Sequence, residues 1–324
     1  MSHSIQRRTA LLTLGGSFIA SKFAVADPGY PTKPVSLISG YAAGGPVDIF
    51  GRLAANHLSG FLNVPFVVET RAGASGMIAG DHVARSAPDG YQLLVTVPSL
   101  FTMLPFMNEN IRVRSSDFTP IGQIAEAPLV LLCNPDLPAR NAKDLFKLLR
   151  KGPSLAFASA GPGTLPHLTA ELLLSRIAAS AQHVPYKGSA PALQDLIGGQ
   201  IHFSTDNIAP ALPAIKAGRL RALAVTSSKR YAGLPDVPTL QESGVDDFNV
   251  TNWFGIFAPA GTAQPVVGRL ADAMARMTHD PAFIERVHTL GGVPVDQTPA
   301  QTAARIATES AQWGPLIRKL GLKA

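Results

Sequence analysis

Two short glycine-rich segments contain residues that could bind an anion through backbone amide groups. Residues 43–46 read Ala-Gly-Gly-Pro, and residues 161–164 read Gly-Pro-Gly-Thr, with His167 one helical turn later. Each segment follows an apolar run typical of a buried strand and precedes apolar residues at helical spacing. Because the first amide groups of a helix have no partners within it, both segments predict a site for a carboxylate or another anion. The alternatives are a tight turn at 43–46 and a capped helix with a solvent-facing histidine at 161–167.

Two aspartates lie at the ends of predicted strands or the starts of predicted helices. Asp48 follows the first glycine segment, and Asp206 precedes Asn207 at the end of a short strand. The helix dipole stabilises a carboxylate at the position of Asp48 whatever its function, and Asp206-Asn207 is also typical of an Asx turn. Either carboxylate could instead accept a hydrogen bond from a ligand hydroxyl, an ammonium group or a bound water.

The sequence contains few groups suited to catalysis. The eight histidines show no metal-ligand spacing, and the single cysteine, Cys133, lies in an apolar run that favours a buried, inert thiol. No Gly-Lys-Ser/Thr follows the glycines, so a Walker-type loop is absent. We therefore expect no catalytic residue, metal or cofactor. The alternative is a cofactor enzyme in which Lys187 forms a Schiff base and residues 161–164 hold a cofactor phosphate.

Strands alternate with helices along most of the chain, which predicts a parallel sheet with helices on both faces. The chain has 324 residues, of which 46% are hydrophobic and 15% charged, enough for two α/β lobes. We expect residues 129–133 to cross into a second lobe and residues 253–258 to return from it. The predicted domains are residues 27–126 and 254–324 for the first lobe and 127–253 for the second. A helix over 299–320 ends the chain.

The N-terminal segment has the three parts of a secretory signal. Arg7-Arg8 precede an apolar stretch over 10–20, and Ala-Val-Ala at 24–26 supplies small residues for cleavage. The arginine pair resembles a twin-arginine signal, although ordinary signals also contain such pairs. We expect residues 1–26 to be removed and the protein to function in the periplasm. The predicted signal holds three cations and no acid, so the net charge falls from +6 to +3, and nucleic acid is a poor candidate partner.

A set of motifs spread over the mature chain resembles one family of receptors. The motifs are Ala-Gly-Gly at 43–45 with Asp48, Gly-Ala-Ser-Gly at 73–76, Ala-Pro-Asp-Gly-Tyr at 87–91, Ser-Ala-Gly at 159–161, Gly-Thr at 163–164 with His167, Val-Pro-Tyr-Lys-Gly at 184–188, Asp-Asn at 206–207, Arg-Ala-Leu-Ala-Val at 221–225, Trp-Phe-Gly at 253–255 and Ala-Pro-Ala-Gly at 258–261. Together they resemble the Bug (TctC-like) solute receptors of tripartite tricarboxylate transporters.

The resemblance implies an α/β fold of the two-lobed periplasmic binding proteins, a type II-like clamshell with two crossover strands. It implies a monomer that captures a small carboxylated metabolite (a di- or tricarboxylate, an acidic amino acid or an aromatic acid) and presents it to membrane subunits of the transporter. The alternative is a signalling receptor that docks on a sensor kinase. The predicted ligand-binding residues are Tyr41, Ala43, Gly44, Gly45, Asp48, Ser75, Gly76, Ser99, Gly163, Thr164, His167, Asp206 and Asn207.

The chain departs from the family pattern beside this predicted pocket. Tyr41-Ala42 stands where the family usually has Phe-Pro, and Ser75 and Pro162 replace residues that are more often glycine and asparagine. The ligand of a relative therefore does not transfer directly to this chain.

Overall fold

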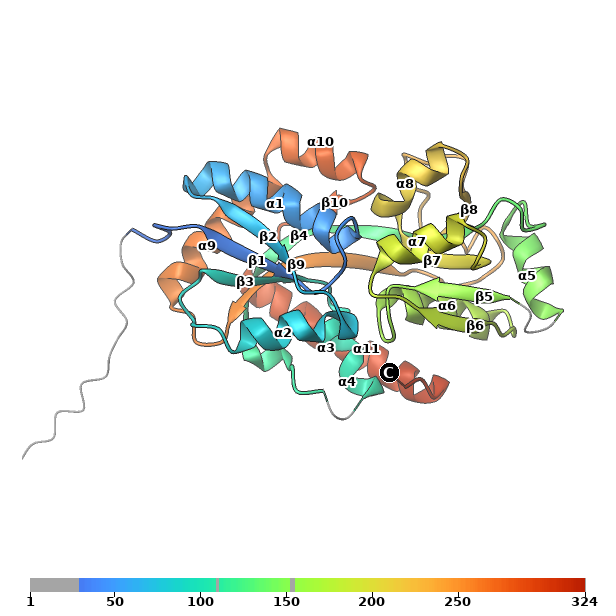
Figure 1. The fold of residues 1–324 in the computed structure, drawn as a ribbon, viewed down its shortest axis with the longest axis horizontal. Helices are drawn as coiled ribbons and strands as arrows, with labels where there is room; N and C mark the ends of the chain where they lie inside the picture. The colour runs from blue at the N-terminus through green and yellow to red at the C-terminus, as the bar shows by residue number, and fades with distance from the viewer. Residues whose placement is uncertain (1–28, 109–110, 152–154, 324) are drawn as a thin grey trace, which may run out of the picture.

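One long strand, β4 (Phe118–Cys133), runs through both halves of the molecule (Figure 1). The structure is a computed structural model, and it describes residues 29–108, 111–151 and 155–323. The other strands are β1 (Val35–Ser39), β2 (Phe66–Thr70), β3 (Gln92–Thr96), β5 (Ala156–Ser159), β6 (Gln182–Pro185), β7 (Phe203–Asn207), β8 (Arg221–Val225), β9 (Thr251–Pro259) and β10 (Val293–Pro294). The helices are α1 (Pro46–Leu62), α2 (Met77–Ala84), α3 (Ser99–Thr102), α4 (Leu104–Met107), α5 (Ala142–Arg150), α6 (Leu165–Arg176), α7 (Ser189–Ile197), α8 (Ile208–Lys216), α9 (Gln264–Thr278), α10 (Pro281–Thr289) and α11 (Pro299–Leu320), with 3-10 turns at η1 (Ala74–Gly76) and η2 (Ser115–Asp117).

The strands are ordered β2-β1-β3-β9-β4-β7-β5-β6, so β9 and β4 lie at the centre. The outer strands of each half are parallel, as the alternation of strands and helices predicts. The prediction of a wholly parallel sheet is wrong at the centre, because β9 pairs antiparallel with both β3 and β4, and β4 pairs antiparallel with β7. A chain that leaves one lobe along one strand and returns along its neighbour must run in opposite directions on the two strands.

The first crossing strand begins 11 residues earlier than the apolar run at 129–133 indicates, at Phe118. Two shifts of register, at Pro120/Gly122 and at Gln123/Ala125, interrupt its pairing with β9. Such irregularities break the alternation by which a strand is recognised in a sequence. The returning strand β9 includes all of residues 253–258, as expected.

Each half of the molecule has its own apolar core. In the first half, the buried rings of Phe50 on α1 and Phe254 on β9 stack with centroids 4.4 Å apart. In the second half, Phe157 and Phe203 pack with centroids 5.6 Å apart. The last helix, α11, joins the two, because Ile306 belongs to a core of the first half and Ile317 to a core of the second.

No helix within the described ranges is both long and apolar enough to cross a membrane. The predicted signal peptide, residues 1–26, lies outside the described residues. Cys133 is fully buried, as predicted, and burial raises the pKa of its thiol to about 11.

Candidate functional site

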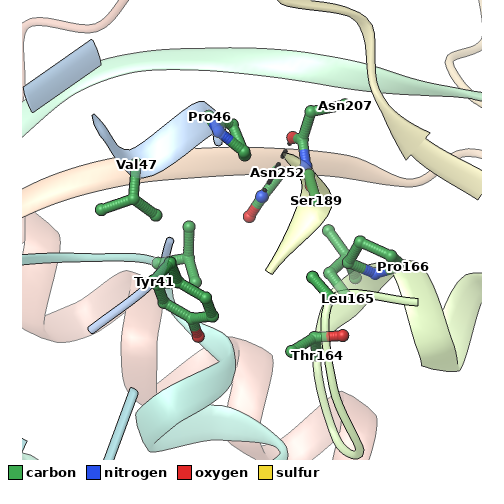
Figure 2. Close-up of a pocket in the computed structure, with 11 residues that line it drawn as sticks. Tyr41, Pro46, Val47, Thr164, Leu165, Pro166, Ser189, Asn207 and Asn252 are labelled. Carbon is green, nitrogen blue, oxygen red and sulfur yellow. Dashed lines mark hydrogen bonds between the residues drawn. The ribbon is translucent and has the colours of Figure 1, made fainter. Parts of the chain in front are cut away.

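Four helices from the two lobes point their N-termini at one small cavity. Its walls include the first turns of α1 and α6, the first residue of α7 and the N-cap of α8, and Figure 2 shows these side chains around a common space. The cavity encloses about 20 Å³ for the centres of water molecules, room for one or two. Helix N-termini present unpaired amide hydrogens and a positive dipole end, so their convergence favours an anion. The lining residues are Tyr41, Pro46, Val47, Val97, Ala160, Thr164, Leu165, Pro166, Ser189, Asn207 and Asn252.

The glycine turn before α1 forms one edge of the site. Gly44 has a φ of +78°, which favours glycine, and its amide donates to Asp48 Oδ2 at 3.0 Å. Asp48 Oδ1 accepts from Arg52 Nε at 2.8 Å, so both carboxylate oxygens hold the turn and its helix. Gly45 is the N-cap of α1. The strand-to-helix turn therefore forms where the sequence predicts it, and Asp48 stabilises it by hydrogen bonds to the Gly44 amide and to Arg52.

Tyr41 lies between this turn and the 3-10 turn η1. Its hydroxyl donates to the carbonyl oxygen of Ser75 at 2.9 Å, and its ring lines the cavity. Burial raises the pKa of Tyr41 to about 12, against a smaller lowering effect of the Ser99 hydroxyl. Gly76 lies against the Tyr41 ring, and a Cβ there would come within 3.3 Å of it. Tyr41 and Ser75 thus form one connected wall, and Gly76 packs behind it against the Tyr41 ring.

The loop over 161–164 forms the facing edge on the second lobe. Thr164 is the N-cap of α6, but its hydroxyl donates to the carbonyl oxygen of Gly161 at 2.7 Å and not to the helix or to the cavity. The amide of Gly163 donates to His167 Nδ1 at 3.1 Å. The loop is therefore held from within by Thr164 and His167.

The prediction of a solvent-facing His167 as the alternative is wrong, because this ring is 4% exposed. It stacks on His183 with centroids 3.9 Å apart, and the His183 Nε2 lies 2.7 Å from Ser159 Oγ. Burial lowers the pKa of His167 to about 3, with a further contribution from His183, and burial lowers the pKa of His183 to about 4. Both rings are therefore neutral near pH 7, and His167 accepts a hydrogen bond as a neutral ring must.

A polar group completes the cavity where β7 meets α7 and α8. Ser189 Oγ donates to Asp206 Oδ1 at 2.6 Å. Asn252 Nδ2 donates to Asn207 Oδ1 at 3.1 Å, and Figure 2 shows this second bond. Gly188 is the N-cap of α7, and Ser189 is its first helical residue. Ser189 and Asn252 also line the cavity and are not among the predicted ligand-binding residues, because no local spacing links either residue to its hydrogen-bond partner.

The predicted ligand-binding residues fall into two groups. Tyr41, Thr164 and Asn207 line the small cavity, and Tyr41 and Ser75 line a second cavity beside it. The others surround these walls: Ala43 and Gly44 are exposed, and the remainder are buried supports, namely Gly45, Asp48, Gly76, Ser99, Gly163, His167 and Asp206.

The family model of the tripartite tricarboxylate transporter family receptor (TctC) matches this chain over residues 50–322. The chain belongs to this family. It is 35% identical to Protein BugT of Bordetella pertussis over 324 residues, which cover 97% of this chain and 98% of BugT. The predicted resemblance to the Bug receptors is therefore confirmed.

Solved structures of similar chains share the two-lobed α/β fold. Rpa4515 of R. palustris with adipate is 31% identical with a TM-score of 0.89, over 91% of this chain and 99% of that chain. MatC (Rpa3494) from Rhodopseudomonas palustris with bound malate is 30% identical with a TM-score of 0.84, over 89% of this chain and 100% of that chain. The predicted fold class is confirmed.

The two lobes of this TctC-family receptor touch across the cleft. Ser75 Oγ donates to the carbonyl oxygen of Pro162 at 2.7 Å, and the amide of Ala42 donates to the carbonyl oxygen of Lys187 at 3.3 Å. A second cavity of about 210 Å³ lies beside these contacts, and Tyr41 and Ala160 line both cavities. The two lobes are therefore in contact beside the small cavity.

The alternative of a Schiff-base enzyme finds no support in this arrangement. The Lys187 side chain is exposed and contributes its backbone carbonyl to the lobe contact, whereas a Schiff-base lysine needs a desolvated or cationic environment. Within residues 29–108, 111–151 and 155–323, no three His, Cys, Asp or Glu side chains are grouped so that they could hold a metal ion.

Proposed function

We propose that this receptor captures a small carboxylated metabolite (a di- or tricarboxylate, an acidic amino acid or an aromatic acid) between its lobes and delivers it to the membrane subunits of a tripartite tricarboxylate-type transporter. The observation that carries the proposal is the convergence of four helix N-termini from both lobes on one cavity. The starts of α1, α6, α7 and α8 surround this point, and the positive ends of their dipoles suit a carboxylate. The relatives Rpa4515 and MatC were solved with adipate and malate, respectively.

The small cavity, with room for one or two water molecules, cannot hold a whole acid of this kind. We propose that one carboxylate lies at the helix N-termini while the rest of the ligand extends past Tyr41 and Ala160 into the neighbouring cavity of about 210 Å³. Entry requires the lobes to separate, since Ser75 and Ala42 close the cleft by contacts with the other lobe. Closure around the acid then completes the binding site.

The division into lobes is part of this proposal. The first lobe contains residues 27–126 and 254–324 and the second contains 127–253, so that β4 and β9 connect them. The pairing of β4 with strands of both halves supports this division. We also propose export to the periplasm by the N-terminal signal, with cleavage after Ala26.

Thermal unfolding of the receptor, expressed as the full chain and purified from the periplasm, tests the capture of an acid. The protein is refolded to remove bound ligand and then scanned against malate, adipate, citrate, aspartate, glutamate and benzoate. An acid at about 100 times its Kd adds about 2.7 kcal/mol to the free energy of unfolding and raises Tm by several degrees. No shift with any acid would contradict the proposal.

A matched pair of variants locates the site. Ala160→Leu places three more carbons where both cavities meet and should abolish the shift. Ala217→Leu makes the same change at an exposed position after α8 and should preserve it. Circular dichroism and Tm without ligand show whether each variant folds. A full shift in Ala160→Leu would place the ligand elsewhere.

A further inference from the structure

A buried carboxyl group lies directly behind the wall of the ligand cavity. Asp206 on β7 is 0% exposed, and its Oδ1 accepts hydrogen bonds from Ser189 Oγ at 2.6 Å and from the Asn207 amide at 2.7 Å. Its other oxygen, Oδ2, is buried without a hydrogen-bond partner among the described residues. A buried carboxylate normally has each oxygen paired, so a negative charge is poorly stabilised here.

The Ser189 hydroxyl connects Asp206 to the cavity. This hydroxyl has a single hydrogen, and while it donates to Asp206 it has none to offer an anion in the cavity. A contact of 2.6 Å between two oxygens does not fix which one carries the hydrogen. If Asp206 carries a proton on Oδ1, it donates to Ser189 Oγ, still accepts from the Asn207 amide, and leaves the Ser189 hydrogen free for the ligand.

A bound carboxylate favours the protonated arrangement of this pair. A ligand oxygen that accepts from Ser189 Oγ lies no more than about 5.5 Å from Asp206 Oδ1, and a second negative charge so close in a buried site disfavours ionisation. Burial already raises the pKa of Asp206 to about 6, although the hydrogen bonds from Ser189 and Asn207 lower it.

Among the residues that the structure describes, no cation offsets this effect at Asp206. The helices packed against β7 carry the ionisable side chains His167, Glu171, Arg176, Asp195 and Lys216. The neighbouring strand β4 carries Glu126 and Cys133. None of these groups forms a hydrogen bond or an ion pair with Asp206, and Asp195 and Glu126 pair instead with Tyr186 and Arg305.

We propose that Asp206 takes up one proton when a carboxylate binds, so that Ser189 changes from donating to Asp206 to donating to the ligand. Asp206 is thus a positioning residue that acts through Ser189, and ligand affinity rises as the pH falls. This inference rests on the proposed function, because it places the ligand carboxylate at the first turn of α7.

Isothermal titration calorimetry tests the inference on the full receptor, with malate and adipate as probes. Titrations at pH 7.5 in two buffers of different ionisation enthalpy should show uptake of about one proton per bound acid. The Kd should be at least about tenfold larger at pH 8 than at pH 6. The isosteric variant Asp206→Asn should bind without proton uptake, and its Kd should change between these pH values only by the titration of the free acid.

Three results would overturn the inference. The first is that the wild type binds the acid without proton uptake. The second is that Asp206→Asn still takes up a proton on binding, which would place the proton on another group. The third comes from Ser189→Ala, which should lose the pH dependence together with affinity. If this folded variant binds as tightly as the wild type with the same pH dependence, Ser189 does not connect the two groups. If neither acid binds the wild type at any pH while another acid of the thermal scan does, the proposed function stands and the same titrations are made with that acid; if no acid binds, both proposals fail.

Discussion

The hydrogen bond from Ser75 to Pro162 offers a direct test of lobe closure. Ser75 Oγ lies on the first lobe and donates at 2.7 Å to a carbonyl oxygen of the second, so the bond exists only when the lobes are together. Ser75→Ala removes the donor and little else, because the residue is small and 9% exposed. Pro162 is only partly buried, so water can hydrate its carbonyl oxygen in the variant.

The size of the effect follows from the environment of the bond. A hydrogen bond between neutral groups contributes about 0.5–1.5 kcal/mol net, which corresponds to a Kd about 2 to 13 times larger. The lower part of this range is expected, because the other hydrogen bond between the lobes, from the Ala42 amide to the Lys187 carbonyl oxygen, persists in the variant.

Calorimetric titration with whichever of malate and adipate binds the wild type measures this change. Ser36→Ala is the matched control, since it removes a hydrogen bond of 2.6 Å to Glu69 that lies within the first lobe. The control should leave the Kd within about twofold of the wild type, because opening and closing do not alter that bond.

One result would refute the reasoning. If Ser75→Ala binds the acid as tightly as both the wild type and Ser36→Ala, the contact with Pro162 is absent from the ligand-bound receptor. The closed arrangement described above would then differ from the one that holds the ligand.

Two further predictions concern stability. Because the pKa values of His167 and His183 are lowered to about 3 and about 4, the unfolded chain binds protons below about pH 6.5 that the folded chain does not. As the pH is lowered from 6.5 to 4, the free energy of unfolding should therefore decrease by up to about 1.4 kcal/mol per pH unit for each histidine. In His183→Phe, the free energy of unfolding measured by urea denaturation should decrease less steeply with falling pH than in the wild type. An equally steep decrease would contradict the buried neutral pair. Phe50→Ala should lower the free energy of unfolding by about 3–5 kcal/mol in the same assay, because Phe50 is fully buried against Phe254. Ile78→Ala changes a side chain that is 53% exposed and should lower it far less. Similar losses in the two variants would contradict the packing of Phe50.

Local chemistry was enough to predict several features of this receptor. The final helix begins and ends where the sequence indicates, at Pro299 and Leu320. Thr298 caps it together with Gln301, and Gly321 adopts the left-handed conformation that ends it. The turn at Gly44 is predicted from a similar local signal, because glycine permits the positive φ that this short strand-to-helix connection requires. These signals lie within a few neighbouring residues, so the sequence contains them in full.

The polar wall of the cavity was decided only by the tertiary structure. Ser189 meets Asp206 from 17 residues away, and Asn252 meets Asn207 from 45. No spacing rule links such partners, because their contact depends on how β7 and β9 are placed in the sheet and on where α7 begins. His167 on α6 shows the same limit, since the ring of His183 that stacks on it lies on the strand β6. The sequence therefore determines which turns can bind an anion, whereas the packing of strands from both lobes determines which side chains surround it and which of them can hold a proton.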